Sequence, residues 1–307
     1  MEPTPNAPRL GFEAHIRKNQ WLTFLVLGFM FLLLFGAIFA AGYLLGTPPY
    51  VTAILALVGA GIYLVITATR SVSTVLLATR ARPANPALRA EKLLIYKVEE
   101  MAIAAGISPP PKVYVQDSRD INAYAAGLRL EEAVVCVTTG ALEQLDQEEL
   151  EGVIAHEMAH ILNRDIRLAT ITIAVVGSIA MVAEIGIRLM GFGAGRRGRD
   201  REGGHPLILV LAIIFLILAP LFSRLAYLLI SRKREYLADA TGAQLTRNPE
   251  GLARALEKIK GDLPDHPVGS RTAASLYIAN PWTRKSFNTA FSTHPPLEDR
   301  IARLRQM

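Results

Sequence analysis

The pentapeptide His156-Glu157-Met158-Ala159-His160 decides how the fold of this chain is interpreted. Side chains four residues apart lie on the same face of an α-helix, so His156 and His160 can bind one zinc ion together. In the pattern H-E-x-x-H the glutamate takes a proton from a zinc-bound water, which is the chemistry of hydrolysis. The alternative is that both histidines are ordinary core residues of an amphipathic helix, because short motifs also arise by chance.

The residues around this motif predict that it lies on a helix. Asp146 has the position of an N-cap residue, and Glu149 completes a capping box with it. Apolar residues then recur at helical spacing, at Leu150, Val153, Ile154, Met158 and Ile161. We therefore expect a helix with one buried side that carries both histidines.

Apolar residues make up 51% of the chain, and many of them lie in one N-terminal block. No charged residue occurs from Trp21 to Thr69, and Gly46-Thr47-Pro48-Pro49 interrupts the block near its middle. Because roughly 20 apolar residues cross a bilayer as a helix, residues 21–70 predict a transmembrane hairpin after a polar tail at residues 1–20. A cleaved signal peptide does not explain a block of this length with a second span directly behind the first.

Two shorter apolar runs, Leu168–Ala183 and Pro206–Ser223, follow the histidine motif. Residues 166–231 are therefore expected to form a second apolar helical hairpin, which either crosses the membrane or packs on the soluble part. The loop between the runs contains four arginines: Arg196, Arg197, Arg199 and Arg201. These charges oppose an external position of the loop, whereas the apolar runs favour a spanning hairpin.

The distribution of basic residues predicts the orientation of the chain in the membrane. Arginine and lysine residues flank the first hairpin at both ends, and the turn between its helices carries no charge. By the positive-inside tendency, residues 71–165 are expected in the cytoplasm. The net charge of +6 is therefore attributed to topology and not to nucleic-acid binding, since no aromatic residues accompany the arginine cluster.

The remaining pattern predicts an α+β fold that is mainly helical. A helix is expected to open at Asn85-Pro86 and to stop at Gly106, and two more begin at Asn248-Pro249 and after Pro295-Pro296. Short strands are expected at Lys112–Val115, Asn122–Ala126 and Ala133–Thr138. The single cysteine, Cys136, excludes an internal disulfide and is expected to be a small core residue of the last strand.

A tetrahedral zinc site with two histidines and a water needs one more protein ligand. Glu235 is the best candidate, because His160 and Glu235 are equally far along the chain from the middle of the 191–204 loop. An antiparallel hairpin between them brings both to the same level and places residues 232–307 on the cytoplasmic side. Asp239, one turn later, can accept the second ring N–H of a ligating histidine. Alternatively, Glu235 only pairs with a neighbouring arginine on the surface, which contributes about 0–1 kcal/mol.

The motif followed by Glu235-Tyr236-Leu237-Ala238-Asp239 resembles the integral-membrane metallopeptidases of the HtpX (heat-shock protease X) type. These are gluzincins related to the prenyl-protein (CAAX) proteases. Ile121–Gly127, Ser231–Ala240 and Thr293–Ile301 are similar to further segments of that family, so the resemblance covers about residues 20–307. Departures are the extended N-terminus and Tyr124 in place of phenylalanine, and neither is at a ligand position.

The resemblance implies the chemistry and the location of the protein. One zinc ion per chain would be bound by His156, His160 and Glu235, with Glu157 as the general base in peptide-bond hydrolysis. Members of the family degrade misfolded or damaged membrane proteins from the cytoplasmic side. The implied partners are the lipid bilayer and polypeptide substrates, with no nucleic acid. The implied location is the cell (plasma or inner) membrane, as a multi-pass protein whose catalytic site faces the cytoplasm.

Three further residues are expected near this centre. Asn122 and Tyr124 lie in a predicted edge strand, which can pair with an extended substrate by strand addition. His294 is an oxyanion donor or an alternative ligand, or it only belongs to the start of the last helix. The expected fold is thus a zincin-like catalytic domain with a small sheet, plus two clear transmembrane helices and the second apolar hairpin.

The sequence leaves two alternatives to a membrane-bound zinc endopeptidase. A processing peptidase of the prenyl-protein protease kind would act on one lipidated substrate, but those enzymes usually have more membrane spans. An inactive membrane adaptor would keep the zinc fold for structure alone, and it would have no use for Glu157 as a base. The endopeptidase is therefore the leading prediction.

Overall fold

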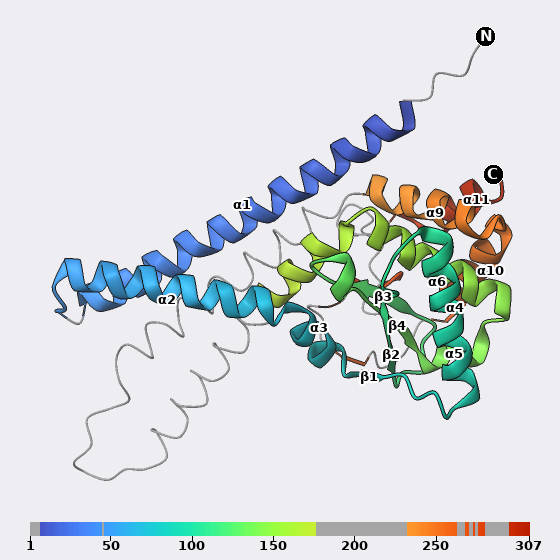
Figure 1. Ribbon diagram of the computed structural model, residues 1–307, viewed down its shortest axis with the longest axis horizontal. Helices are drawn as coiled ribbons and strands as arrows, with labels where there is room; N and C mark the ends of the chain where they lie inside the picture. Colours follow the sequence, from blue (N-terminus) through green and yellow to red (C-terminus); the bar gives the residue numbers. More distant parts are fainter. Residues whose placement is uncertain are drawn as a thin grey trace.

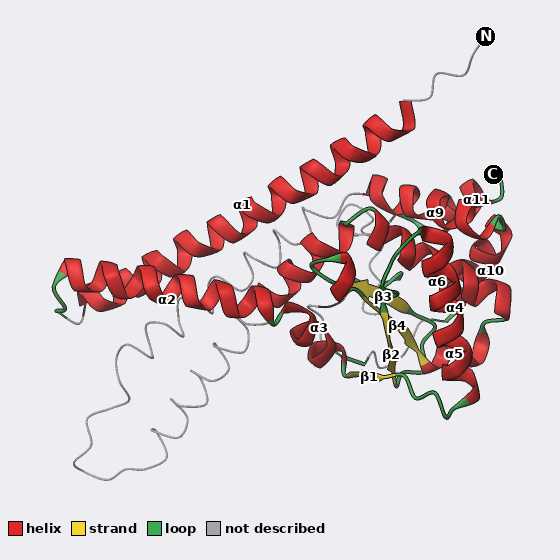
Figure 2. Ribbon diagram, viewed as in Figure 1, coloured by secondary structure: helices red, strands yellow, loops and turns green. Residues whose placement is uncertain are grey.

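Two long helices form a hairpin that leads away from a body of shorter helices around a small sheet (Figure 1). This arrangement comes from a computed structural model, which describes residues 7–44, 46–175, 232–262, 268–269, 273, 276–279 and 295–307. The elements in chain order are α1 (Ala7–Leu44), α2 (Pro49–Thr69), α3 (Ser71–Thr79), β1 (Ala81–Pro83), α4 (Arg89–Ala105), β2 (Lys112–Gln116), β3 (Ala123–Ala126), η1 (Leu130–Glu132), β4 (Val134–Thr138), α5 (Thr139–Gln144), α6 (Gln147–Leu162), α9 (Arg232–Thr246), α10 (Pro249–Gly261) and α11 (Leu297–Leu304). Another helix begins at Asp165 and is described as far as Val175. Helices outweigh strands, as expected for this fold class (Figure 2).

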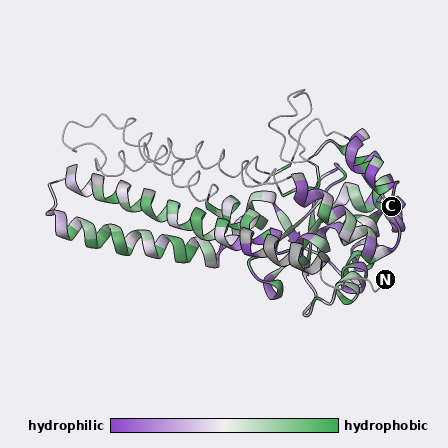
Figure 3. Cartoon of the chain, turned by 90° about the horizontal axis from the view of Figure 1, so that it is seen from above, coloured by the Kyte–Doolittle hydropathy of each residue, from purple (hydrophilic) through white to green (hydrophobic). Residues whose placement is uncertain are grey.

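The N-terminal apolar block forms the predicted pair of antiparallel helices, α1 and α2. Gly46 adopts φ +77° in the turn between them, a conformation that favours glycine. Helix α2 is long and apolar enough to cross a membrane, whereas the apolar stretch of α1, Gln20–Gly36, is shorter. Apolar residues extend along both helices (Figure 3), and the large side chains of Tyr50 and Ile54 are exposed. Helix α1 begins at Ala7, so most of the segment expected as a polar tail is helical.

The second apolar hairpin was expected at residues 166–231, and only residues 166–175 of it belong to the described part of the chain. The four arginines of its loop and His294 lie outside the described residues. Whether this hairpin spans the membrane therefore stays a prediction.

The sheet has four strands in the order β1-β2-β4-β3. Strands β2 and β4 are parallel, whereas β1 pairs with β2, and β3 with β4, in the antiparallel sense. The three predicted strands coincide with β2, β3 and β4 to within one residue at each end. Strand β1 was not predicted, because three residues are too few to show an alternating pattern. As the last strand in the order, β3 is an edge strand, as predicted.

One predicted helix boundary was wrong. The helix expected to open at Asn85-Pro86 begins at Arg89, as α4. The Oδ1 atom of Asn85 accepts a hydrogen bond from the backbone nitrogen of Ala87 at 3.0 Å, and Leu88 is extended, with φ −88° and ψ 125°. Asn85 therefore caps a turn, and the chain changes direction once more before the helix starts.

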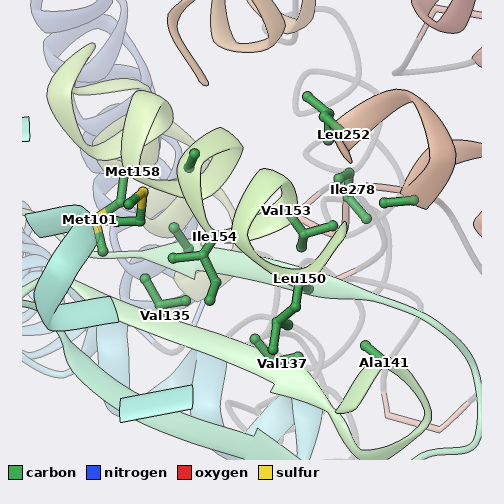
Figure 4. Close-up of a cluster of buried hydrophobic side chains, with 14 of the residues drawn as sticks. Met101, Val135, Val137, Ala141, Leu150, Val153, Ile154, Met158, Leu252 and Ile278 are labelled. Atoms are coloured by element: carbon green, nitrogen blue, oxygen red, sulfur yellow. The ribbon is translucent and has the colours of Figure 1, made fainter. Parts of the chain in front are cut away.

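Helix α6 occupies the centre of the body, between the sheet and the helices α9 and α10. Leu150 and Ile154 face Val135 and Val137 of β4 in the main apolar core (Figure 4). On the other side, a Cβ atom at Gly152 would lie 2.6 Å from the backbone nitrogen of Leu252 in α10. Glycine thus permits a close helix crossing. Helix α6 is therefore covered on two sides, whereas one buried side was expected, and 11 of its 16 residues are buried. The isolated sequence pattern does not reveal this second covered face.

Candidate metal centre

The cap of α6 and a close crossing with α9 position the histidine motif. Asp146 accepts a hydrogen bond from the backbone nitrogen of Glu149 at 2.9 Å, and the Glu149 carboxylate accepts one from the nitrogen of Asp146 at 2.8 Å. This confirms the predicted capping box. On α9, a Cβ atom at Gly242 would lie only 3.1 Å from the backbone nitrogen of His156. The absence of a side chain there brings the acidic residues of α9 directly against the motif.

The structure brings the three predicted ligands together. The Nε2 atoms of His156 and His160 lie 3.2 Å apart. Of the two carboxylate oxygens of Glu235, Oε2 lies 3.8 Å from Nε2 of His156 and Oε1 lies 3.7 Å from Nε2 of His160. Donor atoms about 2.0–2.1 Å from a tetrahedral zinc ion lie about 3.3–3.4 Å from one another. One donor atom from each of the three side chains lies within 4.8 Å of the other two, which is somewhat wider than this spacing, and two imidazoles with one carboxylate form a donor set that zinc accepts.

A carboxylate lies beside the Nδ1 atom of each histidine. The distance from His156 Nδ1 to Asp239 is 3.0 Å, and the distance from His160 Nδ1 to Asp165 is 3.5 Å. Such partners orient a ligating ring and leave its Nε2 atom for the metal. Asp239 was predicted in this position, whereas Asp165 was not. Asp165 begins the helix after α6, five residues beyond His160, and the turn at residues 163–164 brings it back to the ring, which no pattern in the sequence indicated.

Arg300 of α11 lies behind the histidines and is completely buried. Its guanidinium donates two hydrogen bonds to Asp239, from Nε at 2.8 Å and from Nη2 at 2.7 Å. Its Nη1 atom lies 3.5 Å from the carboxylate of Glu235. Arg300 lies within the segment Thr293–Ile301, and its sequence predicted no role for this residue. A buried arginine needs a buried acid, so this residue connects α11 to the two acidic residues of α9.

Glu157 lines a cleft together with His160, Glu235, Ala125 of β3 and Ile278. Burial raises the pKa of its carboxyl group to about 7, although His160 and a hydrogen bond from the backbone of Ala125 act in the opposite direction. A general base works best when its pKa lies near the working pH. The position and the pKa of Glu157 therefore suit proton transfer in this cleft.

The two histidines have opposite pKa shifts. Burial lowers the pKa of His156 to about 4, so its ring is neutral at pH 7, which is the form that binds a metal. Burial also acts on His160, but the carboxylates of Asp165, Glu235 and Glu157 outweigh it and raise the pKa of His160 to about 9. The acidic groups thus favour a positive charge among them, and a metal dication would supply one.

Tyr124 points away from the cleft. Alternate residues of a strand face opposite sides of a sheet, so Ala125 lines the cleft whereas Tyr124 belongs to the core on the other face. The hydroxyl of Tyr124 hydrogen-bonds that of Thr79 at 2.6 Å, and its ring meets the ring of Tyr277 edge-on. The side chain of Tyr124 therefore supports the strand from behind.

The short segment 276–279 lies along the outer edge of β3. The backbone nitrogen of Ile278 donates to the carbonyl of Ala123 at 3.0 Å, and the side-chain amide of Asn122 donates to the carbonyl of Ala279 at 2.8 Å. Asn122 thus holds a neighbouring segment at one end of the edge. All four residues of β3 are buried, and Ala125 is the one that lines the cleft.

The chain is similar to known proteases over most of its length. Residues 89–307 match the sequence model of peptidase family M48. A protease HtpX homologue of Streptococcus uberis is 44% identical over 298 residues, which is 95% of this chain and 98% of that protein. A protease HtpX homologue of Streptococcus pyogenes serotype M5 is 41% identical over 295 residues, 94% of this chain and 97% of that protein. A crystal structure of Ste24p from S. mikatae aligns with 94% of this chain and 66% of its own, at 19% identity and a TM-score of 0.44.

The family match covers the motif, both acidic residues of α9 and Arg300, and the relatives extend over the apolar hairpin as well. The resemblance stated from the motifs alone is thereby confirmed. The chain belongs to peptidase family M48 and is a membrane metalloprotease related to the HtpX proteases.

Proposed function

We propose that this protein is a zinc-dependent endopeptidase in which His156, His160 and Glu235 hold one zinc ion. The observation that carries the proposal is that His156, His160 and Glu235 each bring one donor atom to within 4.8 Å of the other two, beside a cleft that Glu157 lines. A zinc ion there would polarise the scissile carbonyl and make a water more acidic. Asp239 and Asp165 hold the two imidazole rings, and Arg300 holds Asp239.

Glu157 is proposed as the general base. Its carboxyl group accepts the proton of the attacking water and passes it to the leaving amine. In the metal-free protein burial raises its pKa to about 7, so neither form of the carboxyl group is strongly disfavoured near neutral pH. The role requires the group to face the cleft, and Glu157 is among the residues that line it.

The substrate is proposed to bind in an extended form beside β3. The strand is the last of the sheet; segment 276–279 bonds to its edge at Ala123, and Ala125 lines the cleft together with Glu157. A polypeptide that adds to such an edge forms main-chain hydrogen bonds and needs no particular sequence. This mode suits a protease for misfolded proteins, and Asn122 would act by holding segment 276–279 at the end of the edge.

The proposed substrates are misfolded or damaged membrane proteins, cleaved at the cytoplasmic face of the cell membrane. The cleft includes Ile166 and Ala169 on the helix that begins at Asp165. Further along this helix, Ile171 and Val175 pack against Met30 and Leu34 of α1. The site is therefore close to the base of the apolar hairpin, within reach of a chain that emerges from the bilayer.

Zinc analysis together with cleavage of casein tests the metal and the base separately. Glu157→Gln should keep one zinc ion per chain and lose activity, because it removes a base and not a ligand. His156→Ala and Glu235→Ala should lose both zinc and activity. Asp239→Ala should weaken zinc binding by about 10–100-fold, the range for groups that orient a ligand. Loss of zinc from Glu157→Gln, or full zinc in Glu235→Ala, would contradict these roles, and activity in Glu157→Gln would exclude it as the base.

Cysteine labelling in intact cells tests the orientation. Cys136 needs no replacement, because it is buried and burial raises its pKa to about 12, which makes the thiol unreactive. Thr47→Cys, in the turn between α1 and α2, should react with an impermeant reagent. Glu143→Cys, exposed on α5, should react only after the cells are opened. The reverse pattern would place the catalytic body outside the cell.

A further inference from the structure

A second cavity lies on the catalytic body, and two of its lining residues, Leu128 and Arg167, contact the apolar hairpin. It has a volume of about 250 Å³ and is lined by Leu128, Arg129, Leu130, Glu131, Ile161, Arg164, Ile166 and Arg167. A cavity of about 10–15 Å³ holds one water molecule, so this cavity has room for a much larger group. Three arginines against one glutamate make its lining positive.

The three arginines of this cavity have N–H groups that can donate hydrogen bonds to a ligand. Within the described residues, Arg129, Arg164 and Arg167 form no ion pair, and the buried Nε atom of Arg167 has no hydrogen-bond partner. A guanidinium carries five N–H donors in a planar fork that matches the oxygens of a phosphate group. A buried donor without a partner is unfavourable, so a ligand that accepts its hydrogen bond would be stabilising.

The cavity lies at the level where the apolar hairpin begins. The guanidinium of Arg167 lies 5.9 Å from the centre of the Phe24 ring on α1. Phe24 and Trp21 are 60% and 70% exposed at the start of the apolar stretch, and tryptophan is enriched at the boundary between lipid headgroups and water. Leu128, in the wall of the cavity, packs against the apolar cluster of the hairpin that contains Met30 and Ala60.

From this geometry we propose that Arg129, Arg164 and Arg167 form a binding site for the phosphate group of an anionic phospholipid. The phosphate would receive hydrogen bonds from the guanidinium groups, including the Nε–H of Arg167. The acyl chains would lie along the exposed apolar residues of α1, such as Phe24 and Leu25. The site would hold the catalytic body at a defined depth beside the bilayer, whether or not the metal centre is loaded.

Native mass spectrometry of the detergent-solubilised full chain tests this site. Phosphatidylglycerol is titrated into the wild type and into the double variant Arg164→Asn/Arg167→Gln, with phosphatidylcholine as the zwitterionic comparison. Each arginine near an anionic lipid contributes about fivefold to binding, so the double variant should bind phosphatidylglycerol about 30-fold more weakly. Binding of phosphatidylcholine should be weaker in the wild type and little changed in the variant.

The control is Arg247→Asn/Arg303→Gln, which removes the same charge elsewhere. Arg164 and Arg247 both have a positive φ, 54° and 53°, so asparagine relieves the same backbone strain at both positions. The guanidinium of Arg303 also lies over an aromatic ring, 3.8 Å from the centre of Tyr236, as that of Arg167 lies 5.9 Å from the centre of Phe24. The control pair should bind phosphatidylglycerol as the wild type does.

Inorganic phosphate, added at millimolar concentration, distinguishes the two sources of the ligand. If it does not displace phosphatidylglycerol, the ligand is the lipid headgroup; if it binds alone and is lost in the double variant, the site takes a free phosphate. Equal lipid binding by the wild type and the double variant, or an equal loss in the control pair, would overturn the proposal. Should the double variant unfold, the exposed Arg129→Gln gives the same test with an expected fivefold loss.

Discussion

Replacing Arg300 by methionine tests whether the buried acids of the metal centre depend on this one cation. Methionine keeps much of the length and volume of arginine but removes its charge and its donors. Asp239 would lose two hydrogen bonds, of 2.7 and 2.8 Å, while it stays buried beside His156. Removing one partner of a buried ion pair destabilises a protein by about 3–5 kcal/mol, because the other charge is left without compensation. In a body of this size, that loss lowers the melting temperature by about 10 °C.

Thermal unfolding of the metal-free full chain in detergent, followed by circular dichroism, measures this loss. Arg305→Met is the matched control, because Arg305 lies at the end of the same helix. Its ion pairs with Glu250 and Glu257, at 3.1 and 2.8 Å, are exposed and should contribute no more than about 1 kcal/mol. Adding Asp239→Asn to Arg300→Met should cause less further loss than Asp239→Asn causes in the wild type, since the two residues act as a pair.

Two results would refute this reasoning. Equal melting temperatures of Arg300→Met and Arg305→Met would show that the buried pair contributes no more than an exposed one. Strictly additive losses in the double variant would show that Asp239 and Arg300 do not stabilise each other, despite their contact.

Two more predictions concern the same site. In the metal-free protein the pKa of Glu157 is raised from 4.5 to about 7, so its carboxyl group favours folding when protonated, and this contribution is lost as the pH rises through that interval. Between pH 5 and pH 8 the wild type should therefore lose about 2–3 kcal/mol of unfolding free energy relative to Glu157→Gln, and parallel pH profiles of the two proteins would contradict the raised pKa. Gly242→Ala should push α9 away from α6, because the new methyl group meets the backbone of His156 at 3.1 Å; zinc titration should show weaker binding. Gly261→Ala, which meets nothing within 4 Å, should bind zinc as the wild type does, and equal binding by both variants would exclude a role for the close crossing.

Short-range patterns of the sequence were sufficient for the elements that hold the site. The capping box at Asp146 and Glu149, the helix that carries the motif, and the strands β2, β3 and β4 all depend on neighbours within a few residues. The apolar block of α1 and α2 and its turn at Gly46 follow from composition in the same way. Glu235 was predicted over a longer range. His160 and Glu235 are equally far along the chain from the 191–204 loop, and an antiparallel hairpin between them would bring both to the same level.

Other features were decided only by tertiary packing. Helix α4 begins at Arg89 and not at Asn85-Pro86, because the side chain of Asn85 accepts a hydrogen bond within a turn instead of capping the helix. Asp165 and Arg300 joined the site without a local signal, since the partner of a buried charge is selected by distance in space and not by position in the chain. The same holds for Gly242. A glycine inside a helix indicates lower helix propensity in the sequence, and only the crossing with α6 shows that its missing side chain lets Glu235 and Asp239 reach the histidines.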